Sequence, residues 1–363
     1  ITEAWIDSGT TPPGLTTTIG GDVVLASTPP PDGTLTLIDR LGVDVVTRIE
    51  VPTGNVLQQI HAQSTNAGET GFRANPHDWL RLNEGTGLIS RHEPNRNPNA
   101  TELDQGNDVI SVDIPSGLIT GRIDLSSLGE TLDGTLIYAR PTYLQPLNNT
   151  VAIGLARLSL DFRTAGKGAL GLYNTLNHEL TRVDFKDTAN CGTIASMPGS
   201  LNELWVLCAG DTFSSTEQRR LRSGIIRVSL TSPGTAISTY QWLAKSHGNV
   251  LVPSTGLIPI NHHLVVAVAT GDALQKEKDQ ILVIDTDTNT TTVLFEADDS
   301  FILGQGCYAA EHNRMLIPDA SVGIRRWSVT ENLEFLPLPT IDTSPLRRLP
   351  AREIRPLVGT AAP

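Results

Sequence analysis

One pattern recurs six times along this chain of 363 residues: an apolar, alternating run that ends in a short polar residue and a turn. The six copies are VVTRIEVPTG around Glu50, VISVDIPSG around Asp113, ALGLYNTLNH around Asn174, GIIRVSLTSPG around Ser229, QILVIDTDTN around Asp285 and GIRRWSVTEN around Ser328. Their spacings are 63, 61, 55, 56 and 43 residues. A period of this length is typical of a repeated four-stranded unit with loop insertions.

A second alternating run follows each copy, and a further pair of apolar runs precedes it. The runs that follow are NVLQQIHA, LITGRIDL, ELTRVDF, AISTYQW, TTVLFEA and LEFLPLPTI. Alternation with a period of two predicts half-buried strands, and no window of similar length has a helical period. We therefore predict an all-β fold with little or no helix, a single β-propeller domain over residues 1–363 built from four-stranded antiparallel blades.

Six blade units can be counted, at about 21–62, 75–127, 140–186, 190–243, 249–297 and 301–341. Two further segments, Ala4 to Gly9 and Arg352 to Val358, read as isolated strands. Strands from the two termini commonly close a propeller and remove its exposed edge. The alternative is seven blades, with a composite blade contributed by both termini.

Composition and charge restrict the partners. The formal net charge is −12, which argues against a nucleic-acid partner because phosphate recognition needs a basic face. No run of 18 apolar residues is present, so no transmembrane segment is expected. The chain begins with Ile1, which suggests a processed or trimmed N-terminus.

Three cysteines bear on the compartment. We place Cys191 and Cys208 on neighbouring antiparallel strands, where a cross-strand disulfide is geometrically allowed. Such a bond would indicate an oxidising compartment, whereas the alternative is two buried free thiols. Cys307 has no candidate partner and is expected to be a buried thiol.

Long polar insertions recur at one place in the unit, between the second and third strands. They are His92 to Asn107, Arg157 to Lys167, Asp211 to Ser223 and Gly271 to Asp279. These loops would lie on one face of a propeller, and loops on a rigid scaffold commonly carry binding sites. The alternative is that they are solvated surface loops with no binding role.

The strand pairs VISVDIPSGLITGRIDL and ILVIDTDTNTTTVLFEA, preceded by segments such as ANPHDWLRLNEGTGLIS, resemble the YVTN-type β-propeller repeats of bacterial secreted and surface-layer proteins. The resemblance covers roughly Gly21 to Ile341 and is closest in the second and fifth units. The chain is also similar to secreted, lipoprotein-like bacterial propellers that carry GDVVL, LIDR, NPHD, GND and NCG segments. The resemblance implies a propeller in an extracellular, periplasmic or outer-surface location, with no established chemistry.

The best candidate site lies where the second unit begins. His77 and Asp78 would point toward the central channel, as a metal-ligand pair or as a base with its orienting carboxylate. Arg91 and Glu93, with His92 between them, end the second strand on the same face, and Arg140 has the matching position in the next unit. The alternative is that His77 and Asp78 only bond to backbone groups where the blade begins.

Two other patterns are weaker. The spacing of Asp285, Asp287, Asn289 and Glu296 is similar to that of a calcium loop, but Thr290 stands where the sharp turn needs glycine, so a hairpin turn is the simpler interpretation. The adjacent His262 and His263 would point to opposite sides of a strand and are unsuited to a shared zinc ion. We expect no cofactor and no metal site.

No nucleophile elbow, zinc-protease, P-loop or dinucleotide-binding motif is present. We therefore expect an exported, non-enzymatic binding or scaffold propeller whose loop-rich face docks a protein partner or a larger surface assembly. One alternative is a lactonase-like hydrolase with a divalent cation at the channel mouth. Another is a structural subunit of an extracellular assembly.

Overall fold

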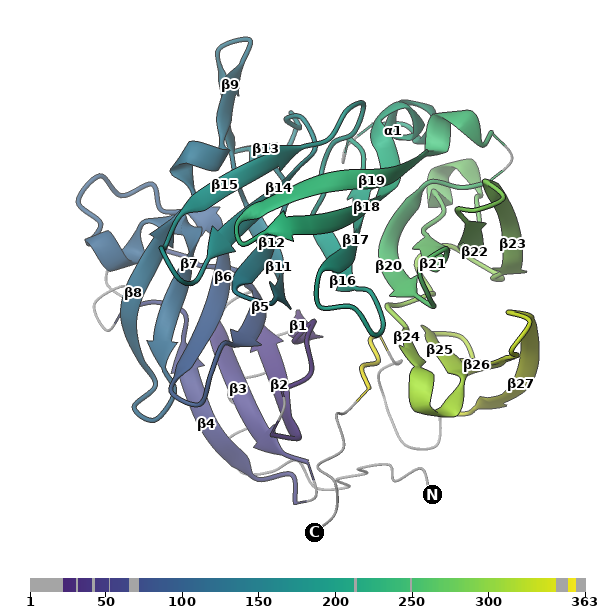
Figure 1. The fold of residues 1–363 in the computed structure, drawn as a ribbon, viewed down its shortest axis with the longest axis horizontal. Helices are drawn as coiled ribbons and strands as arrows, with labels where there is room; N and C mark the ends of the chain where they lie inside the picture. Colours follow the sequence, from purple (N-terminus) through teal and green to yellow (C-terminus); the bar gives the residue numbers. More distant parts are fainter. Residues whose placement is uncertain are drawn as a thin grey trace. The chain divides into compact units, whose positions relative to one another are not determined.

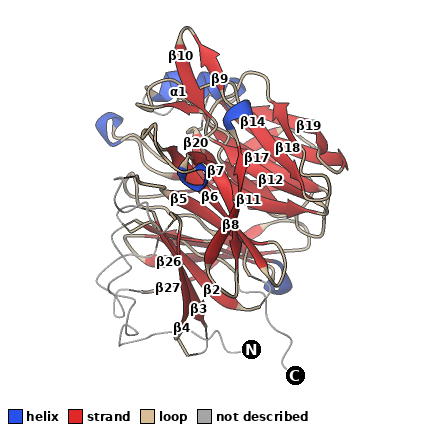
Figure 2. Ribbon diagram, turned by 90° about the vertical axis from the view of Figure 1, so that its left-hand side faces the viewer, coloured by secondary structure: helices blue, strands red, loops and turns tan. Residues whose placement is uncertain are grey.

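The structure is a computed structural model and describes residues 22–30, 32–40, 43–51, 53–64, 72–211, 214–248, 250–343 and 352–356. Strands dominate these residues, with one α-helix and several short 3-10 helices (Figures 1 and 2). Among the described residues, no helix is both long and apolar enough to cross a membrane.

Contacts divide the chain into two compact units. Unit 1 comprises residues 1–127, 139–144 and 357–363, and unit 2 comprises residues 128–138 and 145–356. Strand β11 (Pro141–Leu147) begins in unit 1 and ends in unit 2. One domain over the whole chain stays a prediction.

Unit 1 contains two antiparallel sheets whose strands pair in chain order (Figure 1). The first consists of β1 (Val23–Leu25), β2 (Thr34–Asp39), β3 (Val45–Glu50) and β4 (Val56–His61). The second consists of β5 (Pro76–Arg81), β6 (Thr86–Pro94), β7 (Gly106–Asp113) and β8 (Leu118–Asp124). Side chains such as Ile38, Val46, Trp79 and Ile110 form one buried cluster with residues from both sheets. Burying a side chain of this size contributes roughly 1.5–3 kcal/mol, so this shared core is what holds unit 1 together.

Four further four-stranded sheets are formed by the strands from β11 onward, and each is antiparallel. They are β11 with β12 (Thr150–Leu155), β14 (Ala169–Asn174) and β15 (Leu180–Asp184); then β16 (Thr193–Ser196), β17 (Glu203–Ala209), β18 (Ser223–Ser232) and β19 (Thr235–Leu243); then β20 (Pro253–Pro259), β21 (Leu264–Ala269), β22 (Gln280–Asp285) and β23 (Thr290–Glu296); and β24 (Cys307–Ala309), β25 (Arg314–Asp319), β26 (Gly323–Val329) and β27 (Phe335–Ile341). Buried clusters join successive sheets, as Trp205 with Val265 and Val266 with Trp327 illustrate.

The predicted repeat corresponds to the third strand of each four-stranded sheet. Glu50, Asp113, Asn174 and Asp285 are the last residues of β3, β7, β14 and β22. Ser229 and Ser328 lie near the ends of β18 and β26. The run after each copy is the fourth strand, as predicted, and the fourth strands are largely exposed. The all-β fold and the antiparallel four-stranded sheets are therefore confirmed.

The number of sheets differs from the six that were counted. A seventh sheet, of three strands, pairs β9 (Glu130–Leu132) with β10 (Thr135–Tyr138), and β10 with β13 (Leu158–Ser159). Asp133 and Gly134 connect β9 to β10 with positive φ angles of 49° and 79°. Asp-Gly is a strong hairpin signal because both central residues of such a turn need positive φ. This signal lies in the linker between two predicted units and was missed.

Only a part of the two predicted terminal strands can be compared with the structure. Ala4 to Gly9 lies outside the described residues. Of the predicted strand Arg352 to Val358, residues 352–356 are described, and Glu353 makes one isolated parallel bridge to Gln305. The prediction of a regular strand is therefore wrong for residues 352–356.

The four insertions do lie between second and third strands, and they carry short elements of their own. These are the 3-10 helix η3 (Glu102–Asp104), strand β13, helix α1 (Thr216–Arg222) and the 3-10 helix η6 (Ala273–Gln275). Ser215 caps α1, since its side chain accepts a hydrogen bond from the Gln218 N–H. Three other short 3-10 helices of the described chain lie outside these insertions, namely η4 (Ser126–Leu128), η5 (Ala244–Ser246) and η7 (Ala310–His312).

Candidate functional site

The predicted site residues of the second sheet lie at two irregularities of its strand pairing. Pro76 pairs with Arg91 and Asp78 pairs with Ser90, so His77 is an extra residue in β5. Between β6 and β7, a second shift falls between Arg91 and Pro94. Bulges of this kind re-aim side chains and are common beside functional sites. Here they change the direction of the chain at His77 and again at His92 and Glu93.

Asp78 is fully buried and links three segments of unit 1. Its carboxylate accepts hydrogen bonds from the Ser27 N–H at 2.8 Å, the Ser27 hydroxyl at 2.5 Å and the Leu144 N–H at 2.7 Å, as well as from its neighbour, the Trp79 N–H. Burial raises the pKa of Asp78 to about 6, although these hydrogen bonds act in the opposite direction. Asp78 thus bonds mainly to backbone N–H groups, in the segment after β1, in β5 and in β11, which agrees with the backbone-bonding alternative described above.

His77 and His92 stack on each other. Their ring centroids are 4.3 Å apart and their planes differ by 14°. His77 is partly exposed, whereas His92 is buried and its Nδ1 lies 3.3 Å from the Pro141 carbonyl oxygen. Burial, followed by the charge of Arg140, lowers the pKa of His92 to about 3. Burial also lowers the pKa of His77 well below its usual value, helped by His92, Arg40 and Arg140.

Arg140 is fully buried beside this pair. Its guanidinium makes an ion pair with Glu93 at 2.8 Å, and its backbone N–H donates to the Asn107 side chain at 2.7 Å. Its φ of 49° is left-handed, a conformation that few residues other than glycine and asparagine adopt without support. The Asn107 bond and the Glu93 ion pair provide such support.

Arg91 has a different set of partners. Its side chain is fully buried and makes a two-point ion pair with Asp108, with both N–O distances at 2.7 Å. It also donates to the Leu103 carbonyl oxygen and lies 3.4 Å from Asp104. Arg91 therefore anchors the insertion between β6 and β7, and its guanidinium is already engaged by the protein.

The structure thus brings together four of the residues near the start of the second unit, His77, His92, Glu93 and Arg140. It adds Arg40, at the end of β2, which sequence reasoning did not include. Arg40 is paired with Asp22 at 2.7 Å. Asp78 and Arg91 serve the packing of unit 1 instead.

A second set of functional residues was missed, namely polar residues that begin the third strand and bind the segment leading into the next sheet. Asp44 accepts hydrogen bonds from the Ala74 and Asn75 N–H groups, and Asp279 accepts from three consecutive N–H groups, those of Phe301, Ile302 and Leu303. Asn107 does the same for Arg140. The sequence could have identified them. Asp44, Asn107 and Asp279 each stand six positions before the polar residue that ends a copy of the repeated run.

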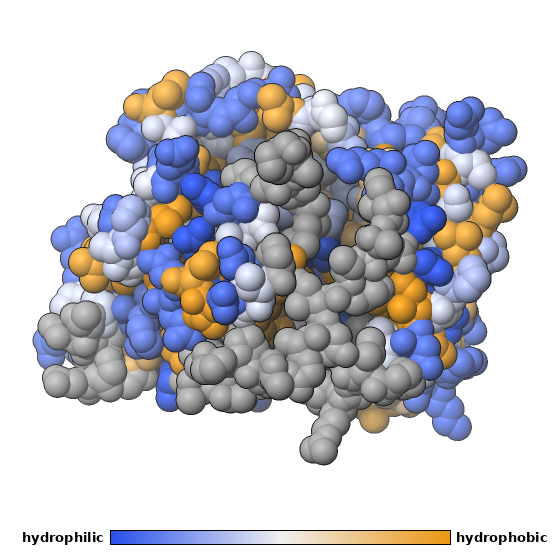
Figure 3. Space-filling model, turned by 90° about the horizontal axis from the view of Figure 1, so that it is seen from below, coloured by the Kyte–Doolittle hydropathy of each residue, from blue (hydrophilic) through white to orange (hydrophobic). Residues whose placement is uncertain are grey.

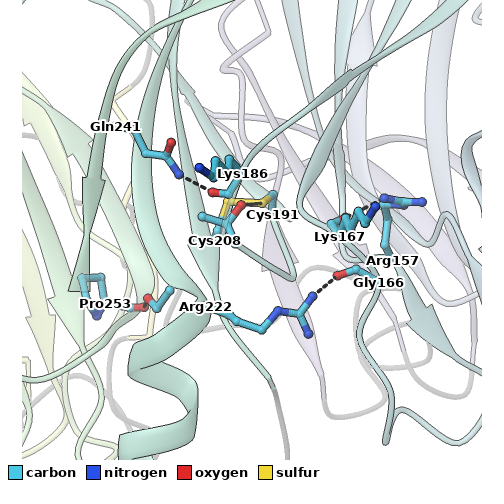
Figure 4. The surroundings of a disulfide bond; sticks show 11 residues. Arg157, Gly166, Lys167, Lys186, Cys191, Cys208, Arg222, Gln241 and Pro253 are labelled. Carbon is cyan, nitrogen blue, oxygen red and sulfur yellow. Dashed lines mark hydrogen bonds between the residues drawn. A yellow bond between two sulfur atoms is a disulfide. The ribbon is translucent and has the colours of Figure 1, made fainter. Parts of the chain in front are cut away.

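Cys191 and Cys208 form a disulfide, so the two free thiols of the alternative are not present. Cys208 belongs to β17, but Cys191 precedes β16 and forms an isolated bridge with Leu155. Around the bond, Arg222 donates to the Gly166 carbonyl oxygen and Gln241 to that of Lys186 (Figure 4). Cys307 is a buried free thiol, as predicted, and burial raises its pKa to about 12.

The two weaker patterns have local roles. The Asp285 carboxylate accepts hydrogen bonds from the Asp287 and Thr288 N–H groups, as expected of a hairpin turn. His262 and His263 lie beside different carboxylates, those of Glu203 and Asp287. In the part of the chain that the structure describes, no group of three or more His, Cys, Asp or Glu side chains is arranged to hold a metal ion.

No family model and no curated protein sequence matches the chain. The resemblance to YVTN-type repeats therefore stays a prediction.

Solved structures show the fold. The chain is similar to Kuenenia stuttgartiensis hydrazine synthase, with a TM-score of 0.55 and 11% identity, over 84% of this chain and 75% of that one. It is similar to a functionally unknown protein from Desulfotomaculum acetoxidans DSM 771, with a TM-score of 0.52 and 8% identity over 83% and 77% of the two chains. For U3-55K the TM-score is 0.53, with 8% identity over 90% and 84%. The chain shares with hydrazine synthase and U3-55K a propeller-like all-β fold.

Proposed function

We propose that the protein is an exported, non-enzymatic binding or scaffold protein that docks a protein partner through the insertions of unit 2. We call this surface the insert layer and define it as the described residues of 128–138, 157–167, 210–222 and 271–279. The observation that carries the proposal is that these four segments bind one another. They form one connected surface on the ends of several sheets.

The contacts run from one insertion to the next. Glu130 of the β9–β10 hairpin pairs with Arg157 at 3.2 Å and accepts the Lys167 N–H. Arg222 of α1 donates to the carbonyl oxygens of Ala165 and Gly166. The Thr216 hydroxyl, at the start of α1, donates to Glu277 at 3.0 Å. Because the connected segments are ordered before a partner arrives, less conformational entropy is lost on binding.

Large apolar side chains project from this layer. Leu136 is 52% exposed, Leu221 59% and Leu274 92%. The hairpin and α1 lie on the same side of unit 2 (Figures 1 and 2). In the view from below, the visible described residues show small hydrophobic groups separated by hydrophilic ones (Figure 3). Apolar anchors surrounded by polar side chains are the usual composition of a protein-binding surface.

Two further features support export and a scaffold role. The disulfide fits an oxidising compartment. The propeller-like fold supports a binding or scaffold role by analogy, since such folds present loops on a rigid frame. Neither the hydrolase nor the structural-subunit alternative has an observation that favours it.

The test of docking compares two double variants of the purified protein. L221E/L274E places charge on the insert layer, and L176E/L201E places charge on other exposed leucines, 66% and 70% exposed, in turns elsewhere in unit 2. A partner is first captured from the exported fraction of the source cells and then purified. Its affinity, measured by calorimetry, should fall at least tenfold for L221E/L274E and stay unchanged for L176E/L201E. Equal affinities for both variants and the wild type would exclude the insert layer as the docking surface.

Export has a separate test. Cells are lysed in the presence of an alkylating reagent, and the labelled cysteines are identified by mass spectrometry. We expect Cys191 and Cys208 to be protected as the disulfide; labelling of both would contradict export to an oxidising compartment.

A further inference from the structure

A cluster of basic groups in unit 1 is separate from the insert layer. It contains the stacked imidazoles of His77 and His92, the guanidinium of Arg140 and that of Arg40. His77 as a residue is partly exposed and the Arg40 side chain is 26% exposed, so these two residues are the ones through which solvent reaches the cluster. His92 and Arg140 form its buried wall.

One polar atom of the cluster has no hydrogen-bond partner. Arg40 directs its Nη2 to Asp22, but its Nε is buried and makes no hydrogen bond within the described part of the protein. A guanidinium N–H without an acceptor costs free energy, and an oxygen anion is the partner that it binds best. The unpaired donor therefore indicates where a ligand oxygen would be stabilised.

The bulges described above contribute to the same place. His77 is the extra residue of β5, and His92 and Glu93 fall within the second pairing shift. Without these two irregularities, strict alternation would send neighbouring side chains to opposite faces of the sheet. The strand geometry is thus altered at the two histidines of the cluster.

The geometry points to a small anion-binding site on unit 1, formed by Arg40, His77, His92 and Arg140, which takes a ligand carrying carboxylate or phosphate oxygens. Arg40 and His77 contact the ligand from the solvent side. His92 acts from behind, through the stacking that orients His77, and Arg140 lies behind them, paired with Glu93. This site goes beyond the proposed docking function and does not depend on it.

Other charged groups around the cluster determine how binding depends on pH. Asp22 pairs with Arg40, Glu93 pairs with Arg140, and the buried Asp78 follows His77 in β5. The two ion pairs balance the two guanidiniums, so the site becomes positively charged when an imidazole gains a proton. The bound anion stabilises that proton on His77, and the affinity for the anion therefore rises as the pH falls.

The experiment uses the purified full chain with citrate and with inorganic phosphate as probes, from about pH 8 to about pH 5. Histidine side-chain resonances are followed by NMR, and affinities are measured by calorimetry. We expect saturable binding at millimolar concentrations, stronger at the lower pH, with the largest shifts for His77 and His92. Preference for citrate over phosphate would identify a carboxylate ligand, and the reverse a phosphate ligand.

Matched variants locate the site. Arg40→Gln and His77→Gln should each weaken binding by on the order of tenfold, the usual value of one charge-assisted hydrogen bond. Arg40→Lys keeps the charge and should retain part of the affinity. His262→Gln removes an exposed histidine from unit 2 and should change nothing.

Failure would also be clear. Shifts that are equal for all histidines, or an affinity that is the same in Arg40→Gln and the wild type, would overturn the proposal. If either variant does not fold, the wild-type spectra still decide, because an absence of selective shifts at His77 and His92 excludes the site.

Discussion

The carboxylate of Asp78 accepts a hydrogen bond from the backbone N–H of Leu144 at 2.7 Å, although the two residues are 66 positions apart. The same carboxylate holds the backbone N–H and the hydroxyl of Ser27, 51 positions away in the other direction. One buried side chain therefore ties the segment after β1, the strand β5 and the middle of β11 together.

Replacing Asp78 with alanine should destabilise the protein by ~3 kcal/mol, because buried N–H donors lose their acceptor and each unsatisfied group costs about 1–3 kcal/mol. The measurement is the free energy of unfolding from urea denaturation. Asp298→Ala removes an exposed carboxylate and should change the free energy by less than ~0.5 kcal/mol. A loss below ~1 kcal/mol for Asp78→Ala would mean that water replaces the carboxylate at no great cost.

Stability should depend on pH through His92. Its pKa is about 3 in the folded protein and ~6.5 when unfolded, so the unfolded state binds the proton first. Its contribution to stability is fully present above pH ~6.5 and is lost as the pH falls toward ~3, by up to ~1.4 kcal/mol per pH unit. The contribution of His77 to stability is also lost as the pH falls, because the pKa of His77 is lowered too.

Asp78 acts in the opposite direction. Its folded pKa, about 6, is above the ordinary aspartate pKa of 3.8, so its contribution to stability is present in acid and is lost as the pH rises through about 6. Comparing the free energy of unfolding of the wild type with that of His92→Gln at each pH isolates the contribution of His92. We expect the stability advantage of the wild type to shrink between about pH 7 and about pH 4, measured by urea denaturation. His262→Gln is the control, and a wild-type advantage that does not change with pH would refute the assignment.

Gly87→Ala should destabilise unit 1. A Cβ at Gly87 would lie 2.0 Å from a ring carbon of Trp79, and Trp79 is fully buried, so the ring cannot move aside. Overpacking of this kind typically costs ~1–3 kcal/mol. Gly121→Ala, in the same sheet, is the matched control, since the nearest atom would be 3.8 Å away. Thermal unfolding of both variants gives the comparison, and equal melting temperatures would show that Trp79 has room to shift.

Removing the disulfide should cost about 3 kcal/mol, the value expected for closing a loop of this length. The Cys191→Ala/Cys208→Ala variant is compared with wild type by urea denaturation, and Cys307→Ala serves as the cysteine control. Thiol titration of denatured, unreduced wild type should find one thiol, and Cys307→Ala should give none. In the native protein Cys307 should not react at neutral pH, because its raised pKa keeps it protonated. Three thiols in the denatured wild type would show that the disulfide is not formed.

Local patterns predicted much of the architecture. Alternation located the strands, and the recurring polar residue at the end of the third strand gave the correct period, as Asp113 and Asp285 show. The hairpin at Asp133 and Gly134 could also have been predicted from its turn residues. It was missed because its strand partner, β13, is only two residues long and lies inside an insertion.

The sequence by itself determined where the chain is extended, where it turns and which residues alternate toward a core. It could not determine what a buried polar side chain would contact. Arg91 was assigned to a binding site beside His77, yet the insertion folds back and supplies Asp104 to it, while β7 supplies Asp108. Strand periodicity is a property of neighbouring residues, whereas the partner of a charge depends on how segments tens of residues apart pack together. Only the tertiary structure could therefore decide that Asp78 and Arg91 hold unit 1 together, and that the partly exposed His77 and Arg40 lie in one cluster with the buried His92 and Arg140.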